Sequence, residues 1–123
     1  MNPTYTDILA MDAYDLIDYL TDTHLCSLPV SINTIEDMEN ASTMLLTLSA
    51  SYSYLCSLLA FSKVMTRDAK RNLDKQEYED FVDKRDIIDQ ITGAVKQQYN
   101  ALSRAVTIHI ENNNELKMGG KNI

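Results

Sequence analysis

Residues 35–72 read IEDMENASTMLLTLSASYSYLCSLLAFSKVMTRDAKRN, without a glycine or proline. Apolar residues recur there at spacings of three and four, which places them on one face of an α-helix. This main stripe consists of Met38, Ala41, Leu45, Leu48, Tyr52, Leu55 and Leu59. Thr34 supplies an N-cap, acids occupy the first turn and bases the last turns, as the helix dipole favours. We predict one helix over residues 35–72, on the order of 57 Å long at about 1.5 Å per residue.

A second apolar stripe runs along another side of the same helix. It consists of Tyr54, Leu58, Phe61 and Met65. A helix that is apolar over more than half of its circumference packs against several neighbours at once. A chain of 123 residues forming one small domain offers few such neighbours. We therefore expect this stripe to contact a second copy of the chain, so that a homo-oligomer completes a helical bundle.

The segments on either side are predicted to be helical as well. Residues 6–25 alternate an apolar face with an acidic face, and residues 76–112 carry apolar side chains at spacings of three and four. A polar turn near residues 73–75 separates the two long segments, and the tail 113–123 is expected to fray. Residues 105–110, AVTIHI, are also compatible with a short strand.

These segments together predict an all-α fold in one domain, residues 1–123. It consists of a short N-terminal helix followed by a long antiparallel helical hairpin. Homo-oligomerisation into a bundle is part of the same prediction.

Charge is distributed unevenly along the chain. The net charge is −7, yet no Lys or Arg precedes Lys63; residues 1–62 carry eight acids, and the remainder carries eleven bases and ten acids. The acidic half repels nucleic acid, so any such contact would use the second half. The N-terminus lacks the basic start of a targeting peptide, and Cys26 and Cys56 lack a paired spacing. We expect a cytoplasmic protein that does not span or bind a membrane.

Two sets of residues are candidates for holding a phosphate-bearing ligand. The first is the basic cluster Lys63, Arg67, Lys70 and Arg71, which Lys75 extends. The second is the ridge Lys96, Asn100 and Arg104, in which two cations frame an amide at helical spacing. Each set has a simpler interpretation, because cations at a helix end complement its dipole and can also pair with acids of another subunit.

No catalytic motif is present, so the sequence predicts a protein that is not an enzyme. The two histidines, His24 and His109, lie on different segments and do not suggest a metal site. Asp12, Asp15, Asp18 and Asp22 share a helical face, which is more typical of a solvated surface than of a cation site. We expect neither a cofactor nor a metal.

Residues 84–118, KRDIIDQITGAVKQQYNALSRAVTIHIENNNELKM, resemble the small all-helical accessory proteins of bacteriophages and prophages. The resemblance implies a non-catalytic, oligomeric protein that acts by binding inside the bacterial host. Some proteins of this kind block host defence, either by occupying a host protein or by sequestering a nucleotide signal. Others assist replication or recombination on nucleic acid, which is the alternative function that we consider.

Overall fold

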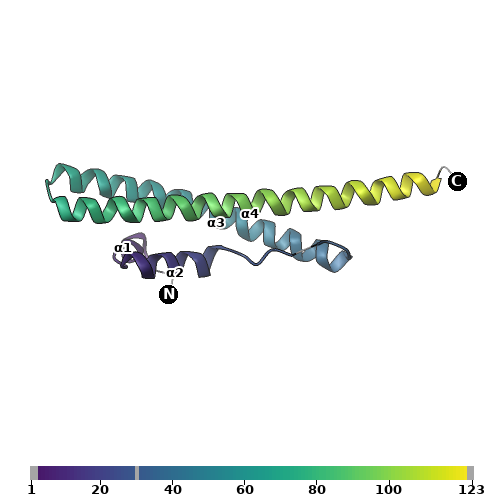
Figure 1. Ribbon diagram of the computed structural model, residues 1–123, viewed down its shortest axis with the longest axis horizontal. Helices are drawn as coiled ribbons and strands as arrows, with labels where there is room; N and C mark the ends of the chain where they lie inside the picture. Colours follow the sequence, from purple (N-terminus) through teal and green to yellow (C-terminus); the bar gives the residue numbers. More distant parts are fainter. Residues whose placement is uncertain (1–2, 30, 122–123) are drawn as a thin grey trace.

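The computed structural model describes the backbone of residues 3–29 and 31–121, and the side chains of those residues up to 114. It contains four helices: α1 (Tyr5–Leu9), α2 (Ala13–His24), α3 (Ile35–Arg71) and α4 (Lys75–Lys121). Helices α3 and α4 form a long antiparallel hairpin, and α1 and α2 lie along one side of it (Figure 1). The described residues include no strand. The predicted all-α class and the helical hairpin are therefore confirmed.

The two long helices pair through buried residues that recur mostly every seven positions, as in a coiled coil. These seam residues are Ala41, Leu48, Leu55, Ser62 and Ala69 on α3, and Ile88, Val95 and Leu102 on α4. Each of them is at most 2% exposed. A seam of this kind leaves two flanks, one on each side of the contact between the helices. Within the described residues, the rest of the chain covers only one of them.

Helices α1 and α2 cover that first flank. Ile8, Leu16 and Leu20 are fully buried against the hairpin, and the aspartates of α2 face solvent. The stripe of Tyr54, Leu58, Phe61 and Met65 lies under this layer: the ring of Tyr5 is 5.5 Å from that of Tyr54 and 5.6 Å from that of Phe61. Leu58 is fully buried. The expectation that this stripe is left for a second copy is corrected, because the N-terminal helices of the same chain reach it.

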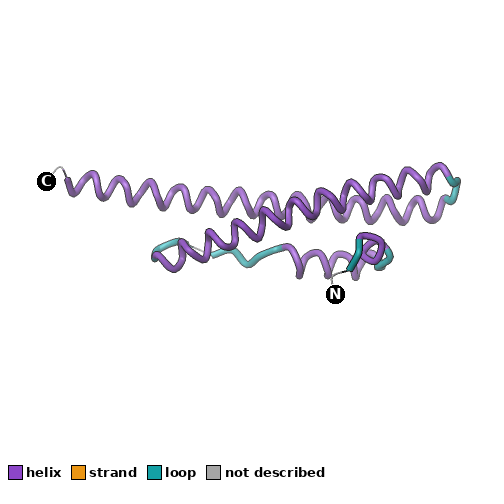
Figure 2. The backbone as a smooth tube through the Cα atoms, turned by 180° about the vertical axis from the view of Figure 1, so that it is seen from behind, coloured by secondary structure: helices purple, strands orange, loops and turns teal. Residues whose placement is uncertain are grey.

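The segment predicted as one helix over residues 6–25 is divided in two. Thr4 caps α1 in a reciprocal pair with Asp7, and the carboxylate of Asp12 accepts a hydrogen bond of 3.0 Å from the backbone of Asp15. Asp12 has an extended backbone and begins α2. The chain therefore turns between Leu9 and Ala13. As a result, two short helices pack along the hairpin in place of the one straight helix that was predicted. Figure 2 shows this bend and the extended connector between α2 and α3.

The hairpin turn lies at residues 72–74. Asn72 ends α3, and Leu73 has a φ of 58°, in the left-handed region. The carboxylate of Asp74 accepts a hydrogen bond of 3.1 Å from the backbone of Glu77, which caps the start of α4. The predicted turn near residues 73–75 thus lies one residue earlier.

Helix α4 is longer than predicted. Residues 105–110 are helical, so the strand alternative is wrong, and the backbone of residues 113–121 continues the helix where a frayed tail was expected. The hydroxyl of Thr107 donates to the carbonyl of Ser103 at 3.0 Å, which a helical backbone permits for a β-branched residue. The end of α4 extends past the start of α3 (Figure 1). Residues 122 and 123 lie outside the described residues.

Candidate binding groove

The second flank of the hairpin, on the side away from α1 and α2, is not covered by other parts of the described chain. We call it the open groove. Two hollows on this flank are lined by Ser49, Tyr52 and Lys70 of α3 and by Tyr78, Lys96, Tyr99 and Asn100 of α4. Helical spacing adds Leu45, Cys56, Leu59 and Lys63 on α3, and Val82, Arg85, Asp89 and Val106 on α4. Leu45, Tyr52, Leu59, Tyr99 and Val106 each follow a seam residue by four positions, so they lie beside the seam on one flank.

The centre of the open groove is hollowed. A cavity of about 330 Å³ is lined by Ser49 and Tyr52 from α3 and by Lys96, Tyr99 and Asn100 from α4. A hydrogen bond with the thiol of Cys56 raises the pKa of Tyr52 above its ordinary value of 10.0. The phenol is therefore protonated near neutral pH. The hollow combines aromatic walls, hydroxyl and amide groups and one ammonium group.

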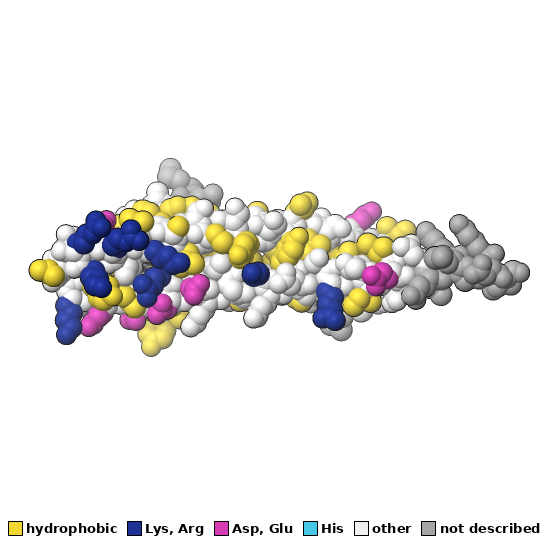
Figure 3. All heavy atoms as spheres, turned by 90° about the horizontal axis from the view of Figure 1, so that it is seen from above, with side chains coloured by type: hydrophobic (Ala, Val, Ile, Leu, Met, Phe, Trp, Pro, Cys, Tyr) yellow, Lys and Arg dark blue, Asp and Glu magenta, His cyan; other side chains and the backbone are white. Residues whose placement is uncertain are grey.

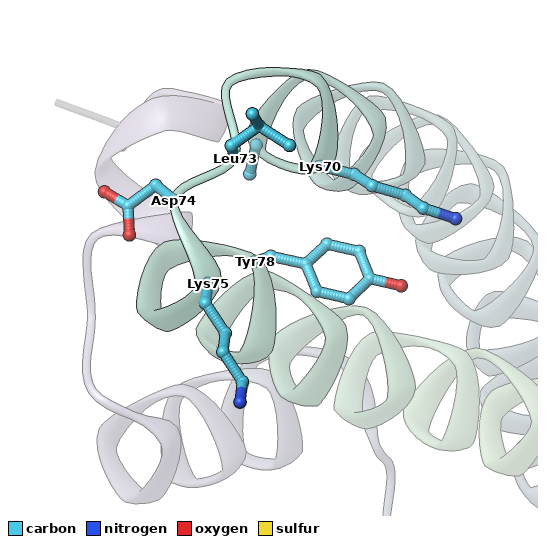
Figure 4. Close-up of a pocket in the computed structure, with 6 residues that line it drawn as sticks. Lys70, Leu73, Asp74, Lys75 and Tyr78 are labelled. Atoms are coloured by element: carbon cyan, nitrogen blue, oxygen red, sulfur yellow. The ribbon is translucent and has the colours of Figure 1, made fainter.

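A second hollow of about 200 Å³ lies at the tip of the hairpin. Ala69, Lys70 and Leu73 line it from the α3 side, and Asp74, Lys75 and Tyr78 from the start of α4. Figure 4 shows the side chains of Lys70 and Tyr78 extending in the same direction between the helices, whereas Asp74 and Lys75 point away from them. Lys70 and Tyr78 thus continue the open groove to its basic end.

Charge separates the two sides of the molecule. Between its two helices the open groove carries Lys63, Lys70, Arg85 and Lys96 together with the acid Asp89, and Asp74 and Lys75 lie at its tip. Arg85 also approaches Asp86, with 3.5 Å between Nη2 and Oδ1. Figure 3 shows Lys and Arg gathered over the hairpin end of this face, with Asp and Glu side chains at its edges, and apolar side chains along its middle. On the opposite side, Asp12, Asp15, Asp18 and Asp22 are exposed. A chain with a net charge of −7 therefore presents one face that is locally positive.

The structure brings members of both predicted ligand sets to the open groove. Lys96 and Asn100 line the central hollow, whereas Arg104 is not among its lining residues. Lys63 and Lys70 flank the groove nearer the tip. Arg67 is exposed and lies four positions after Lys63 and three before Lys70, so it shares their side of α3. Arg71, two positions after the seam residue Ala69, is exposed on the side of α3 away from α4. Two sets that the sequence could not relate to each other thus contribute to one surface.

Sequence reasoning placed Tyr52 and Leu59 in one core stripe with Leu48 and Leu55, and so missed their position at the edge of the core. In the structure Leu48 and Leu55 are fully buried, whereas Tyr52 and Leu59 are only partly buried. The signal was present as a seven-residue recurrence of Leu45, Tyr52 and Leu59, parallel to that of the seam. A stripe wider than one coiled-coil seam indicates a second contact surface.

Three polar side chains hold the covered flank together: Lys84 and His24 are buried, and Gln98 is partly buried. The ammonium of Lys84 donates to the carbonyl of Leu9 and pairs with Asp80 at 2.9 Å. The amide of Gln98 accepts from the backbone nitrogen of Cys26 at 2.9 Å and donates to its carbonyl at 2.8 Å. These contacts fix α1 and the connector against α4, and sequence reasoning did not identify them.

His24 is the third of these side chains. Its Nδ1 is 3.0 Å from the hydroxyl of Ser51, and its ring stacks on that of Tyr54 with 5.3 Å between centroids. Burial lowers the pKa of His24 below its ordinary value of 6.5. A hollow of about 230 Å³ lies beside it, but Nε2 is buried without a hydrogen-bond partner. The imidazole therefore contributes packing, as a neutral ring, to the covered flank.

Within the described residues, no three His, Cys, Asp or Glu side chains lie together as a metal site would require. Helix α3 is long and apolar enough to cross a membrane, with a mean hydropathy of 1.5 in its most apolar 18-residue window. Core helices of soluble proteins share this length and composition. In the structure, 22% of that window is buried.

No family model, curated protein or solved structure matches the chain. Its function is therefore inferred from the geometry and charge of the site.

Proposed function

We propose that this chain is a non-catalytic binding protein that acts through the open groove and antagonises a host defence component in the bacterial cytoplasm. It would do so by occupying a host protein or by sequestering a nucleotide signal. The observation that supports binding at this surface is the combination of uncovered apolar and tyrosine side chains with four cations and one acid between the two helices, in an otherwise acidic chain. The anti-defence role follows from the resemblance to phage accessory proteins.

The central hollow suits an anionic ligand of moderate size. Its volume of about 330 Å³ is at the lower end for small-molecule sites, which span roughly 300–1,000 Å³. Tyr52 and Tyr99 offer faces for stacking, and Lys96 and Asn100 offer donors to phosphate oxygens. A nucleotide would use both kinds of contact.

A homo-oligomer remains part of the proposal, although its contact surface changes. The stripe of Tyr54, Leu58, Phe61 and Met65 is covered within one chain, so a second copy would have to use the open groove or the exposed face of α2. In the latter case, the acidic face of one copy would meet the positive face of another.

Native mass spectrometry of protein purified gently from bacteria tests the proposal. We expect the wild-type chain to carry an added mass, either of nucleotide size or of a protein. The double variant Lys63→Glu with Lys96→Glu should lose it while keeping the helical circular dichroism of the wild type. An added mass that survives the charge reversal, or a wild-type chain free of any added mass, would contradict binding through the open groove.

A second candidate function is an accessory role on nucleic acid during phage replication or recombination. The observation that favours it is the basic end of the groove, where Lys70 lies beside Tyr78 (Figure 4). Binding to a single-stranded oligonucleotide should then weaken steeply with salt. Changing Arg67, Lys70 and Arg71 to Ala should weaken binding at low salt and make its salt dependence shallower, because fewer phosphates are contacted. Absence of binding at low salt would exclude this function.

A further inference from the structure

The hairpin has two grooves of similar construction, and the structure shows what fills the first. That groove holds α2, an amphipathic helix that buries Leu16 and Leu20 and exposes Asp15, Asp18 and Asp22. At its N-terminal end the layer is tied to α4 by Lys84. The covered flank is thus an example, within this chain, of an acidic helix bound by its apolar face.

The open groove also offers apolar side chains, and no other part of the described chain occupies it. Leu45, Tyr52 and Leu59 follow one another every seven residues on α3, and Tyr99 and Val106 do so on α4. From Leu45 to Leu59 the groove runs about 21 Å at about 1.5 Å per residue. That distance is about four turns of helix, comparable with the 12 residues of α2.

The rim of the open groove specifies the charge of its partner. Lys63, Lys70 and Arg85 lie toward the hairpin end, and Lys96 lies beside the central hollow. Such cations favour a partner with carboxylates flanking its apolar stripe, and they disfavour one with basic flanks. We propose that the open groove binds an amphipathic helix with acidic flanks, presented by a partner protein. This inference rests on the proposed function and specifies the partner in its protein-occupancy form.

The apolar content of the groove favours this occupant over two others. Nucleic acid is held by cations and stacking, and does not need the aliphatic side chains of Leu45, Leu59 and Val106. A second copy that placed its own open groove against this one would bring two positive faces together. An amphipathic acidic helix would place its apolar face on the apolar stripe and its carboxylates near the cations of the rim. Amphipathic helices bind hydrophobic grooves in this way.

The probe for the experiment is a peptide of residues 12–25 of this chain, labelled with a fluorophore and held helical by a covalent staple away from Leu16, Leu20 and its aspartates. Its binding to the full chain is measured by fluorescence anisotropy. The matched control peptide carries Asp15→Asn, Asp18→Asn and Asp22→Asn. We expect the acidic peptide to bind in low salt, and the control to bind on the order of tenfold more weakly.

Protein variants then locate the binding surface. Lys63→Glu with Lys96→Glu should weaken binding of the acidic peptide by on the order of tenfold or more. The matched charge reversal Arg71→Glu with Arg104→Glu, on positions facing away from the groove, should change it by less than about twofold. Equal effects of the two double variants would place the peptide elsewhere and overturn the proposal.

Three further results would also overturn it. These are failure of the helical acidic peptide to bind, binding that the control peptide reproduces, and preferential binding of the chain to vesicles of phosphatidylglycerol. In each case, an added mass in the native spectrum that Lys63→Glu with Lys96→Glu removes would still support the proposed function. If Lys63→Glu with Lys96→Glu also leaves the added mass unchanged, both the acidic-helix proposal and the proposed function are contradicted.

Discussion

Gln98 makes two hydrogen bonds that no other described side chain duplicates at the connector. Its amide group pairs with both backbone groups of Cys26, one residue after the C-cap of α2. Backbone groups buried without partners are costly, so a single side chain that satisfies both fixes the position of the connector. The neighbouring Gln97 is exposed and makes no such contact.

We predict that Gln98→Ala lowers the free energy of unfolding by about 1–3 kcal/mol, because both groups of Cys26 lose their partner. Gln97→Ala, the same change one position earlier, should alter it by less than about 0.5 kcal/mol. Urea denaturation followed by circular dichroism measures both. Equal losses in the two variants would show that the connector is not held by Gln98.

His24 gives the fold a dependence on pH. Burial lowers its pKa below 6.5, so the folded chain keeps the imidazole neutral while the unfolded chain takes up a proton as the pH falls. The free energy of unfolding should therefore decrease as the pH falls below about 6.5, until the folded-state pKa is reached. Hydrogen bonds to the backbone of Thr4 and of Asn33 and Thr34 lower the pKa values of Asp7 and Asp37, respectively. The stabilisation from these carboxylates is lost only at more acidic pH.

Replacing His24 by Gln should flatten the pH dependence of the unfolding free energy between about pH 7 and pH 5, while lowering its value at pH 7. Urea denaturation across that range provides the measurement, and His109, still present in the variant, serves as an internal control. If the slope of the variant matches that of the wild type, then the proton uptake belongs to another group.

At the scale of the elements, the hairpin turn contains a local conflict. Leu73 has a φ of 58°, which costs a residue with a Cβ roughly 1–2 kcal/mol, and its side chain is 89% exposed. The turn is therefore set by the caps around it, Asn72 at the end of α3 and Asp74 at the start of α4. Leu73, which lies between these caps, has a left-handed backbone conformation that favours glycine over leucine.

Leu73→Gly should accordingly raise the free energy of unfolding, by about 0.5–1 kcal/mol, because glycine adopts this conformation without strain. Leu46→Gly supplies the matched control: Leu46 is 75% exposed within α3, where glycine should lower stability by about 1 kcal/mol. Thermal or urea unfolding distinguishes the two signs. A loss of stability in both variants would contradict this account of the turn.

The accuracy of each predicted helix boundary depended on whether a local sequence pattern marked it. Helix α3 was predicted to within a residue at its C-terminal end, because its periodicity runs without interruption from Ile35 to Arg71. The break before α2 was missed because the apolar spacing continues across it from Leu9 to Ala13, and only the cap formed by Asp12 marks it.

Site residues followed the same rule. Lys96 and Lys63 were identified by residue type, but their position on one groove depends on the pairing of two helices. The stripe containing Leu58 and Phe61 was recognised as apolar, yet periodicity does not specify which neighbour covers a face. Tertiary contacts decided both points.

At the scale of the whole molecule, Leu58 lies on the covered flank and Leu59 on the open flank. We therefore expect the same substitution to have different effects at these two adjacent positions. Leu58 is fully buried under the N-terminal layer, so Leu58→Asp places an unpaired charge in the core at a cost of about 3–5 kcal/mol. That is a large share of the roughly 5–15 kcal/mol stability of a small domain, and the chain should unfold or lose much of its helical signal.

Leu59→Asp, one position later, faces the open groove and should leave the chain folded while removing partner binding. Circular dichroism and light scattering separate these outcomes. A Leu58→Asp variant that stays folded but changes its mass in solution would show instead that the stripe is an interface between copies.

We propose that the molecule binds its partner with the open groove, and that this surface is free until the partner arrives. Cys56 lies on that surface and is exposed, which makes its thiol a reporter. In a Cys26→Ser background, we would measure the rate at which a maleimide modifies Cys56, with and without the stapled peptide of residues 12–25. The account predicts rapid modification in the free chain and marked slowing once the peptide is bound. A thiol protected before any peptide is added, or modified equally fast at saturation, would contradict it.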